Sequence, residues 1–320
     1  MEAGFRTEKF EDTTRKRPVL IDWWYPVTGQ SAKKFDYGLG KGMVVESGNI
    51  DEGVFPLVVL SHGAMGAARN YSWIAEALAR EGYIVAGVSH FGESYIYGPE
   101  TVDPSAVLRS WERPLDVSAA LSYIENESIF SASIDLRRIG FIGHSSGGAT
   151  AMHLAGVLFD GNRIAEYCAS AESEGDRGCD YALSPGSVPS RAKSEPSGKI
   201  YTDSRIRAFV ALDPALGPGF YDYSMVDPDL KTLVVGSVEN DFLPFRHHAE
   251  RIATGLPNAQ SHWLSNGEGH FIYLNECESG LEANGVPLCI DREGISRRVV
   301  HGKLKILIHD FFNRSLGKRD

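Results

Sequence analysis

The chain has 320 residues, 42% of them hydrophobic and 23% charged, so it can bury a large core as one α/β domain or two smaller domains. Its formal net charge of −10, with no long basic run, argues against nucleic acid or an anionic membrane surface as a partner. No apolar run reaches the roughly 18 residues that a membrane span needs, and the polar start does not resemble a signal peptide. We therefore expect a cytosolic protein, or one whose leader has been removed.

Strand-like and helix-like segments alternate along most of the sequence. Strands are predicted over residues 18–27, 43–48, 55–63, 83–90, 137–148 (strand and turn), 205–215, 230–241 and 259–270 (strand and loop). Helices are predicted over residues 70–82, 105–128 (one or two), 150–159, 246–256 and 297–316. This alternation predicts an α/β protein with a mostly parallel, doubly wound sheet that helices cover on both faces.

One stretch, residues 160–203, breaks the alternation because it has few core residues and many Gly, Pro and Ser. Within the single domain that we expect over residues 1–320, such a stretch is typically functional or disordered. We interpret it as a loop-rich insertion near the functional site.

The four cysteines form two local pairs, Cys168 with Cys179 and Cys277 with Cys289. Loop-forming residues fill both intervening segments, and neither spacing matches the CxxC pattern of zinc sites. We therefore expect two loop-closing disulfides and no metal, which favours a periplasmic or secreted protein. Four free thiols in a cytoplasmic protein are the alternative.

The motif Gly143-His144-Ser145-Ser146-Gly147 follows an apolar strand and precedes a helical pattern. GxSxG in this context is typical of a nucleophile elbow, a sharp turn that exposes a serine hydroxyl. Gly143 and Gly147 would permit the turn, and Gly148 would ease contact between helix and sheet. Ser145 is the predicted nucleophile, and a structural turn without chemistry is the alternative.

A serine hydroxyl needs a base, and His270 is the strongest of the ten histidines. It lies in a glycine-rich loop between the last predicted strand and the last helix, where a doubly wound sheet presents an active-site loop. A carboxylate must then orient the imidazole. Asp241 and Asp213 both qualify, because each directly follows a predicted strand.

Backbone N–H groups can stabilise the oxyanion of an acyl-transfer intermediate without reorganising. Ser146, directly after the nucleophile, is the first expected donor. The second is expected in the turn after the strand 55–63, at Ala64, with Met65 as the less favoured substitute. Aromatic residues that could line an apolar substrate pocket are Phe220, Tyr221, Phe242 and Phe271.

Outside the 160–203 stretch, residues from about 18 to 315 resemble an α/β-hydrolase. The resemblance is to the group of platelet-activating-factor acetylhydrolases, dienelactone-hydrolase-like proteins and bacterial cutinase-type polyester hydrolases. LSHGAMGAARNYSWIAEALAREGYIVAGVSH (60–90) is similar to the acetylhydrolase segment with the oxyanion turn, and GHSSGGAT (143–150) to its elbow. Dienelactone hydrolases themselves have a cysteine where this chain has Ser145, which argues against dienelactone substrates.

The same resemblance bears on the choice of acid. ALDPALG (211–217) is similar to the acid loop of platelet-activating-factor acetylhydrolases, chlorophyllases and pancreatic-type lipases, which favours Asp213. VGSVENDFLPFRHHA (235–249) is similar to the later acid loop of cutinase-type hydrolases, which favours Asp241. Asp241 is preferred, because its position is the commoner one in the fold.

The sequence thus predicts a serine carboxylic-ester hydrolase that forms an acyl-enzyme on a small to medium apolar ester, without cofactor or metal. The alternatives are a hydrolase of another acyl bond, such as a lactone, thioester, amide or polyester, and a non-catalytic ligand-binding relative. The oligomeric state is left open.

Overall fold

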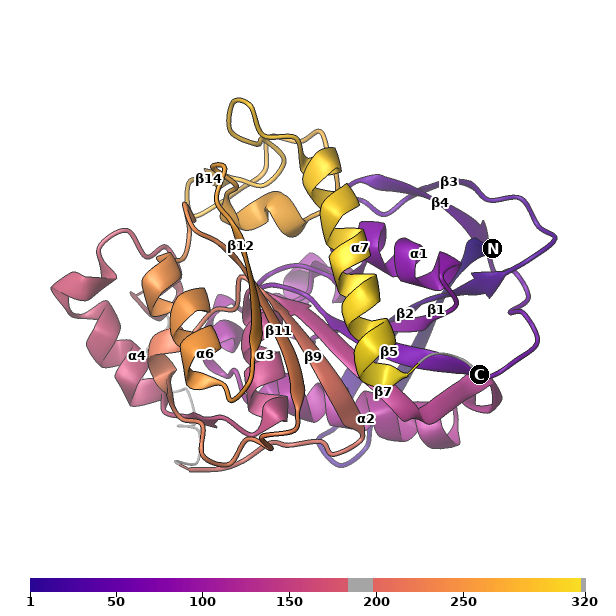
Figure 1. Ribbon diagram of the computed structural model, residues 1–320, viewed down its shortest axis with the longest axis horizontal. Helices are drawn as coiled ribbons and strands as arrows, with labels where there is room; N and C mark the ends of the chain where they lie inside the picture. The colour runs from indigo at the N-terminus through magenta and orange to yellow at the C-terminus, as the bar shows by residue number, and fades with distance from the viewer. Residues whose placement is uncertain (184–197, 318–320) are drawn as a thin grey trace.

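A large twisted sheet forms the centre of the protein in the computed structural model, which describes residues 1–183 and 198–317 (Figure 1). Its strand order is β12-β11-β9-β7-β5-β6-β2-β1-β4-β3. The strands are β1 (Glu2–Asp12), β2 (Arg17–Val27), β3 (Lys33–Asp36), β4 (Lys41–Glu46), β5 (Phe55–Ser61), β6 (Ile84–Ser89), β7 (Ile134–His144), β9 (Ile206–Leu212), β11 (Lys231–Ser237) and β12 (Gln260–Leu264). From β12 to β6 all neighbours run parallel, whereas β2 is antiparallel to β6 and β1. The carboxyl ends of the parallel strands therefore meet at one edge.

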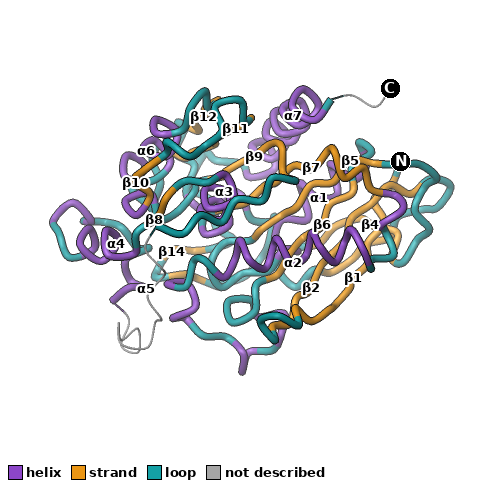
Figure 2. The backbone as a smooth tube through the Cα atoms, turned by 90° about the horizontal axis from the view of Figure 1, so that it is seen from below, coloured by secondary structure: helices purple, strands orange, loops and turns teal. Residues whose placement is uncertain are grey.

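Helices cover both faces of this sheet. Buried side chains of α2, α3 and α6 pack in one core cluster, and those of α1 and α7 pack in another. The α-helices are α1 (Ser72–Arg80), α2 (Glu112–Asn126), α3 (Ser146–Ala155), α4 (Gly161–Cys168), α5 (Cys179–Leu183), α6 (Ala249–Gly255) and α7 (Arg297–Leu316). Figure 2 shows α2 and α7 on opposite sides of the strands. These layers confirm the predicted α/β class, with a mostly parallel sheet between two helical layers.

Short elements complete the described chain. Two small ribbons are β8 (Leu158–Phe159) with β10 (Phe220–Asp222), and β13 (Glu282–Ala283) with β14 (Val286–Pro287). The 3₁₀ helices are η1 (Ala68–Tyr71), η2 (Tyr95–Tyr97), η3 (Pro99–Thr101), η4 (Pro104–Leu108), η5 (Ser131–Ser133), η6 (Ala171–Ser173), η7 (Gly217–Gly219), η8 (Phe245–His247) and η9 (His270–Tyr273). Within the described ranges, no helix is both long and apolar enough to span a bilayer.

The predicted elements differ from the observed ones at several boundaries. Helix α7 has the predicted bounds, whereas α3 begins at Ser146, four residues earlier than expected, because the elbow leads directly into it. The predicted helical stretch 105–128 is divided into η4 and α2. Strand β1 was not predicted: much of it is polar, and it gains its order by pairing with β2 along its whole length.

The stretch 160–203 contains more helix than expected. Its described part includes α4, η6 and α5, and residues 184–197 lie outside the described residues. Both predicted disulfides, Cys168–Cys179 and Cys277–Cys289, are confirmed. Each therefore closes a short segment, one inside this stretch and one between η9 and α7.

Several histidines are buried in the fold as neutral rings. Burial lowers the pKa of His62, His90, His144, His153, His270 and His301 below the ordinary value of 6.5. His153 is the simplest case: burial alone lowers its pKa to about 3, and its Nε2 atom lies 3.2 Å from Ser110 Oγ. The unfolded chain binds protons at these rings below pH 6.5 and the folded chain does not, so stability falls as the pH drops from there toward 3.

We expect His153→Phe to reduce this pH dependence. For each histidine that stays neutral in the fold, the unfolding free energy of the protein falls by about 1.4 kcal/mol between neutral pH and about pH 5.5. The reason is that only the unfolded ring gains a proton. Urea unfolding at about pH 7.5 and about pH 5.5 measures the loss in both proteins. The variant should lose about 1.4 kcal/mol less than the wild type over this interval. An equal loss would show that His153 is protonated in the native state.

Candidate active site

Ser145 lies in a strained turn between β7 and α3. Its backbone angles are φ 55° and ψ −116°, which a non-glycine residue rarely adopts, and its N–H donates to the carbonyl oxygen of Leu212 at 2.9 Å. A Cβ at Gly143 would clash with the backbone of Gly147, and one at Gly147 would clash with the backbone of Ser61 in β5. The glycines of the motif are thus required by close backbone contact, and they permit the sharp turn.

The turn after β5 holds the expected oxyanion donor Ala64 beside Ser145. Both residues border the same two cavities, and Ser146 borders the smaller one. Met65 has a left-handed backbone conformation, with φ 57°. The backbone of this turn lies close to the predicted nucleophile, as an oxyanion site requires, since a Cβ at Gly63 would lie 3.4 Å from Ser145 Cβ.

A buried arginine, Arg113 of α2, holds this turn from behind. Its guanidinium donates to the carbonyl oxygens of His62 at 2.7 Å and Gly63 at 3.4 Å. It also forms a bidentate ion pair with Glu93, and both side chains are almost fully buried. Because Arg113 binds two of its carbonyl oxygens, the turn keeps a fixed orientation.

A chain of hydrogen bonds links the turn to the elbow and to the His270 loop. The N–H of Gly63 donates to Tyr71 Oη at 3.0 Å, and Tyr71 Oη lies 2.8 Å from His144 Nδ1. His144 Nε2 in turn lies 3.0 Å from the carbonyl oxygen of His270. Since that oxygen can only accept, Nε2 carries the proton, and Tyr71 donates to Nδ1. The pattern matches a neutral His144, whose pKa burial lowers.

The structure places His270 next to Asp213. Its Nδ1 atom lies 3.4 Å from Asp213 Oδ2, and both side chains are almost fully buried. Asp213 accepts hydrogen bonds from the backbone N–H of Ser237 at 2.7 Å and from Asn240 Nδ2 at 2.9 Å. These donors hold the carboxylate against the imidazole.

Asp241, the preferred acid in the sequence analysis, lies on a different loop from Asp213, the one that follows β11. Its Oδ1 atom accepts the backbone N–H of His270 at 2.8 Å, and its Oδ2 atom lies 3.4 Å from Arg292. The carboxylate therefore contacts the main chain of His270 and not its ring. The two acids differ in their distance from the strand ends. Asp213 directly follows β9, which lies beside β7, whereas Asp241 lies four residues past the end of β11.

Burial sets the protonation states at this centre. It lowers the pKa of His270 to about 3, with the Asp241 charge acting in the opposite direction, so the ring is neutral near pH 7. Burial also raises the pKa of Asp213, and the N–H of Ser237 opposes that shift. His270 Nε2 is buried and has no hydrogen-bond partner within residues 1–183 and 198–317, Ser145 included. A neutral ring with a free Nε2 can accept a proton, and such bonds often form only when substrate binds.

Ser145 and His270 line one cavity of about 390 Å³. Of the four aromatic residues expected there, Phe242 and Phe271 border this cavity, and Phe242 stacks on the His270 ring with centroids 5.2 Å apart. Phe220 is instead fully buried, and Tyr221 is exposed and borders neither cavity at Ser145. The expectation for those two residues is therefore wrong.

A second Ser–His–Asp chain lies inside the protein. Ser61 Oγ is 2.8 Å from His90 Nε2, and His90 Nδ1 is 3.0 Å from Asp116 Oδ2. All three side chains are almost fully buried, and none of them borders either cavity at Ser145. This set of hydrogen bonds is connected like a catalytic triad but is buried away from both cavities. It links the ends of β5 and β6 to α2 and so stabilises the fold.

Sequence reasoning did not indicate a role for Tyr71, Arg113, Asn240 or the His144 ring. Their partners lie far away in the sequence, such as His144 for Tyr71, so no local pattern indicates them. The part of the chain that the structure describes contains no cluster of three or more His, Cys, Asp or Glu side chains that could hold a metal ion.

Comparisons with known proteins find similarity to one protein family, one curated hydrolase and one solved esterase. A family model described as Chlorophyllase matches residues 31–167, which include Ala64 and Ser145. A bis(hydroxyethyl) terephthalate hydrolase from Streptomyces coelicolor is 24% identical over 237 residues, or 73% of this chain and 56% of that protein. The chain thus spans about half the length of this curated relative. A solved ferulic acid esterase from Streptomyces cinnamoneus has a TM-score of 0.62 and 19% identity, over 98% of this chain and 89% of that one.

We expect Tyr71→Phe to weaken both the fold and the site. It leaves the Gly63 N–H and His144 Nδ1 without their buried partner, at a cost of about 1–3 kcal/mol in unfolding free energy. Urea unfolding measures the loss of stability. The rate at which a fluorophosphonate labels Ser145 measures the reactivity of the site, and this rate should fall in the variant.

Tyr83→Phe is the matched control, because it removes a hydrogen bond to Asn313 at 2.8 Å, away from the cavity. It should lower stability and leave the reactivity of Ser145 unchanged. Equal reactivity in the two variants would contradict a positioning role for Tyr71.

Proposed function

We propose that this chain, which has the α/β-hydrolase fold, is a serine esterase that cleaves carboxylic esters through an acyl-enzyme. The observation that carries the proposal is that the strained Ser145 elbow and the neutral ring of His270 border the same cavity, with His270 Nε2 lacking a hydrogen-bond partner among the described residues. The similarity to proteins named as hydrolases and esterases fits the same group of enzymes.

In the proposed reaction, Ser145 Oγ attacks the ester carbonyl and His270 Nε2 takes its proton. The backbone N–H groups of Ala64 and Ser146 hold the oxyanion. His270 then returns the proton to the leaving alcohol, and water releases the acid from Ser145 in the reverse sequence. Asp213 keeps the Nδ1 proton of His270 in place and stabilises the imidazolium.

Asp213 is thus proposed as the acid in place of Asp241. The support is its 3.4 Å approach to His270 Nδ1, together with the donors that fix its carboxylate. Asp241 is proposed to position the His270 main chain through its 2.8 Å hydrogen bond. The reaction needs no cofactor, since base, acid and oxyanion donors come from the chain itself.

We also propose an apolar, small to medium ester as the substrate, because most of the large cavity wall is apolar. Hydrolysis of another acyl bond is the second candidate, since the same groups serve lactones and thioesters. The two disulfides support an oxidising compartment, secreted or periplasmic.

A fluorophosphonate should label the wild-type protein at one serine, and the label should be lost in Ser145→Ala. Intact-mass spectrometry and peptide mapping detect the adduct, and p-nitrophenyl acetate hydrolysis should disappear in the same variant. A ligand-binding protein without activity would remain unlabelled, and this outcome would refute the proposed function.

For the acid, we compare Asp213→Asn with Asp241→Asn. Asp213→Asn should lower kcat by up to about 10⁴, because the imidazole loses the group that fixes its tautomer. Asp241→Asn keeps an Oδ1 acceptor for the His270 N–H and should cost less than about tenfold. Steady-state kinetics, with urea midpoints to match stability, decide between them. A larger fall in kcat for Asp241→Asn than for Asp213→Asn would show that Asp241 is the acid.

A further inference from the structure

Two cavities of unequal size meet at Ser145. The large one, of about 390 Å³, is bordered by His270 and by the turn from Gly63 to Gly66. The small one, of about 40 Å³, is bordered by Ser146 and not by His270. Ala64, Ser145, Tyr181 and Phe242 border both, so a substrate whose carbonyl carbon lies at Ser145 has a subsite on either side.

The position of the base decides which half of an ester occupies which cavity. The leaving oxygen must reach His270 to receive its proton, so the alcohol half belongs in the large cavity. The acyl group then extends away from His270, past Ser146, into the small cavity. This assignment rests on the proposed function.

One wall of the small cavity is formed by the segment that the Cys168–Cys179 disulfide ties together. Both cysteines border it, as do Ile164 of α4 and Leu243. Asp176 of this segment holds the wall in place, since its Oδ2 atom lies 2.7 Å from His248 Nε2 and both side chains are buried.

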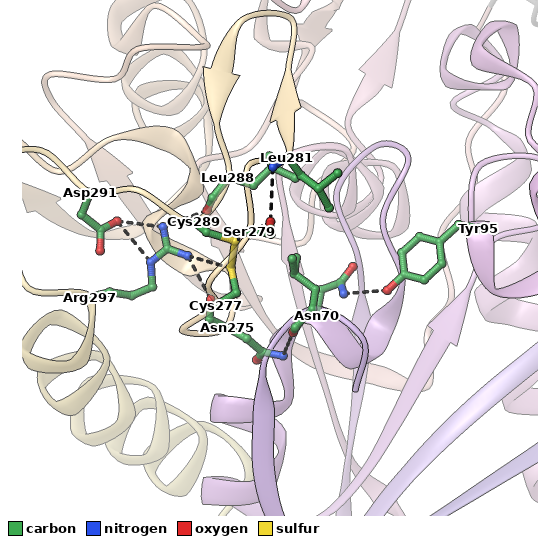
Figure 3. The surroundings of a disulfide bond; sticks show 11 residues. Asn70, Tyr95, Asn275, Cys277, Ser279, Leu281, Leu288, Cys289, Asp291 and Arg297 are labelled. Atoms are coloured by element: carbon green, nitrogen blue, oxygen red, sulfur yellow. Dashed lines mark hydrogen bonds and ion pairs between the residues drawn. A yellow bond between two sulfur atoms is a disulfide. The ribbon is translucent and has the colours of Figure 1, made fainter. Parts of the chain in front are cut away.

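The large cavity is walled by the segment between Cys277 and Cys289. Leu281 and Leu288 border it, and Leu281 is 58% exposed, so this wall faces solvent on its outer side. Figure 3 shows the disulfide beside these leucines and Arg297, which donates to the carbonyl oxygen of Leu288 at 2.9 Å and to Asp291 at 2.7 Å.

We propose that this enzyme selects esters of a short acyl group with a bulky apolar alcohol, and that each disulfide-closed segment sets the limit for one half. A cavity of about 40 Å³ has room for only a small group, since pockets that hold drug-sized ligands measure roughly 300–1,000 Å³. Acetyl and propionyl groups fit, and an aromatic acid does not. The tenfold larger cavity accepts a ring on the alcohol side.

Two isomeric esters test the assignment directly. Benzyl acetate carries the ring on its alcohol and methyl phenylacetate carries it on its acid, and both release an unactivated alcohol. We expect kcat/KM to be at least about tenfold higher for benzyl acetate, since a cavity that excludes a group discriminates by this much or more. Equal values, or a preference for methyl phenylacetate, would overturn the proposal.

A chain-length series adds a test on the acyl side alone. With p-nitrophenyl acetate, butyrate and hexanoate the leaving group is constant, and we expect kcat/KM to fall as the acyl chain grows. Ile164→Ala, which widens the small cavity, should raise the hexanoate-to-acetate ratio about tenfold. Leu281→Ala, the matched control in the large cavity, should leave that ratio unchanged. If neither isomeric ester is hydrolysed, the p-nitrophenyl ester series tests the assignment of the acyl group to the small cavity.

The two levels of proposal fail in different ways. Absence of fluorophosphonate labelling at Ser145 would refute the esterase function itself. The subsite assignment alone would be refuted if the protein is labelled and hydrolyses p-nitrophenyl acetate but does not prefer short acyl chains. It would also be refuted if Ile164→Ala and Leu281→Ala change the hexanoate-to-acetate ratio equally. In both cases the esterase function would stand.

Discussion

The left-handed turn at Ser145 is the constraint on which the rest of the site depends. With φ at 55°, the turn is unfavourable for a serine, so its surroundings must hold it. The N–H of Ser145 is bonded to the end of β9, and its carbonyl oxygen accepts from both Ala149 and Ala215. Neighbouring backbone lies too close for a Cβ at Gly143 or Gly147. The strand order, with β7 between β5 and β9, therefore also places the turn after β5 and the Asp213 loop around the same serine.

Neutral buried histidines couple these parts. His144 connects the turn after β5, through Tyr71, to the main chain of His270, and it can do so only as a neutral ring with one donor and one acceptor. His90 has the same form inside the Ser61–Asp116 chain. Burial holds the pKa of both rings down, so that hydrogen bonding and charge state support each other. The same burial makes the native arrangement sensitive to acid.

Local patterns were sufficient for the fold class, the elbow and the disulfides. Apolar runs predicted the buried parallel strands, and GxSxG within a strand–turn–helix predicted the turn at Ser145. The choice between Asp213 and Asp241 was beyond such patterns, because both follow strands and only the three-dimensional register brings one carboxylate to the imidazole. Strand β1 was missed for a related reason, since its order comes from β2 and not from its own polar sequence.

The subsites differ from the reactive centre in how they are stabilised. Ser145 and the Asp213 loop are fixed by the central sheet, whereas both cavity walls belong to segments with little core of their own. Closing a loop of this size with a disulfide contributes about 3 kcal/mol, and buried pairs such as Asp176 with His248 attach the first wall to the body of the fold. The Asn284 side chain of the second segment donates to the carbonyl oxygen of Arg177 in the first at 2.9 Å, so the walls also support each other. Changes in these segments can therefore alter the shape of either cavity while the strained turn at Ser145 and the ring of His270 stay in place.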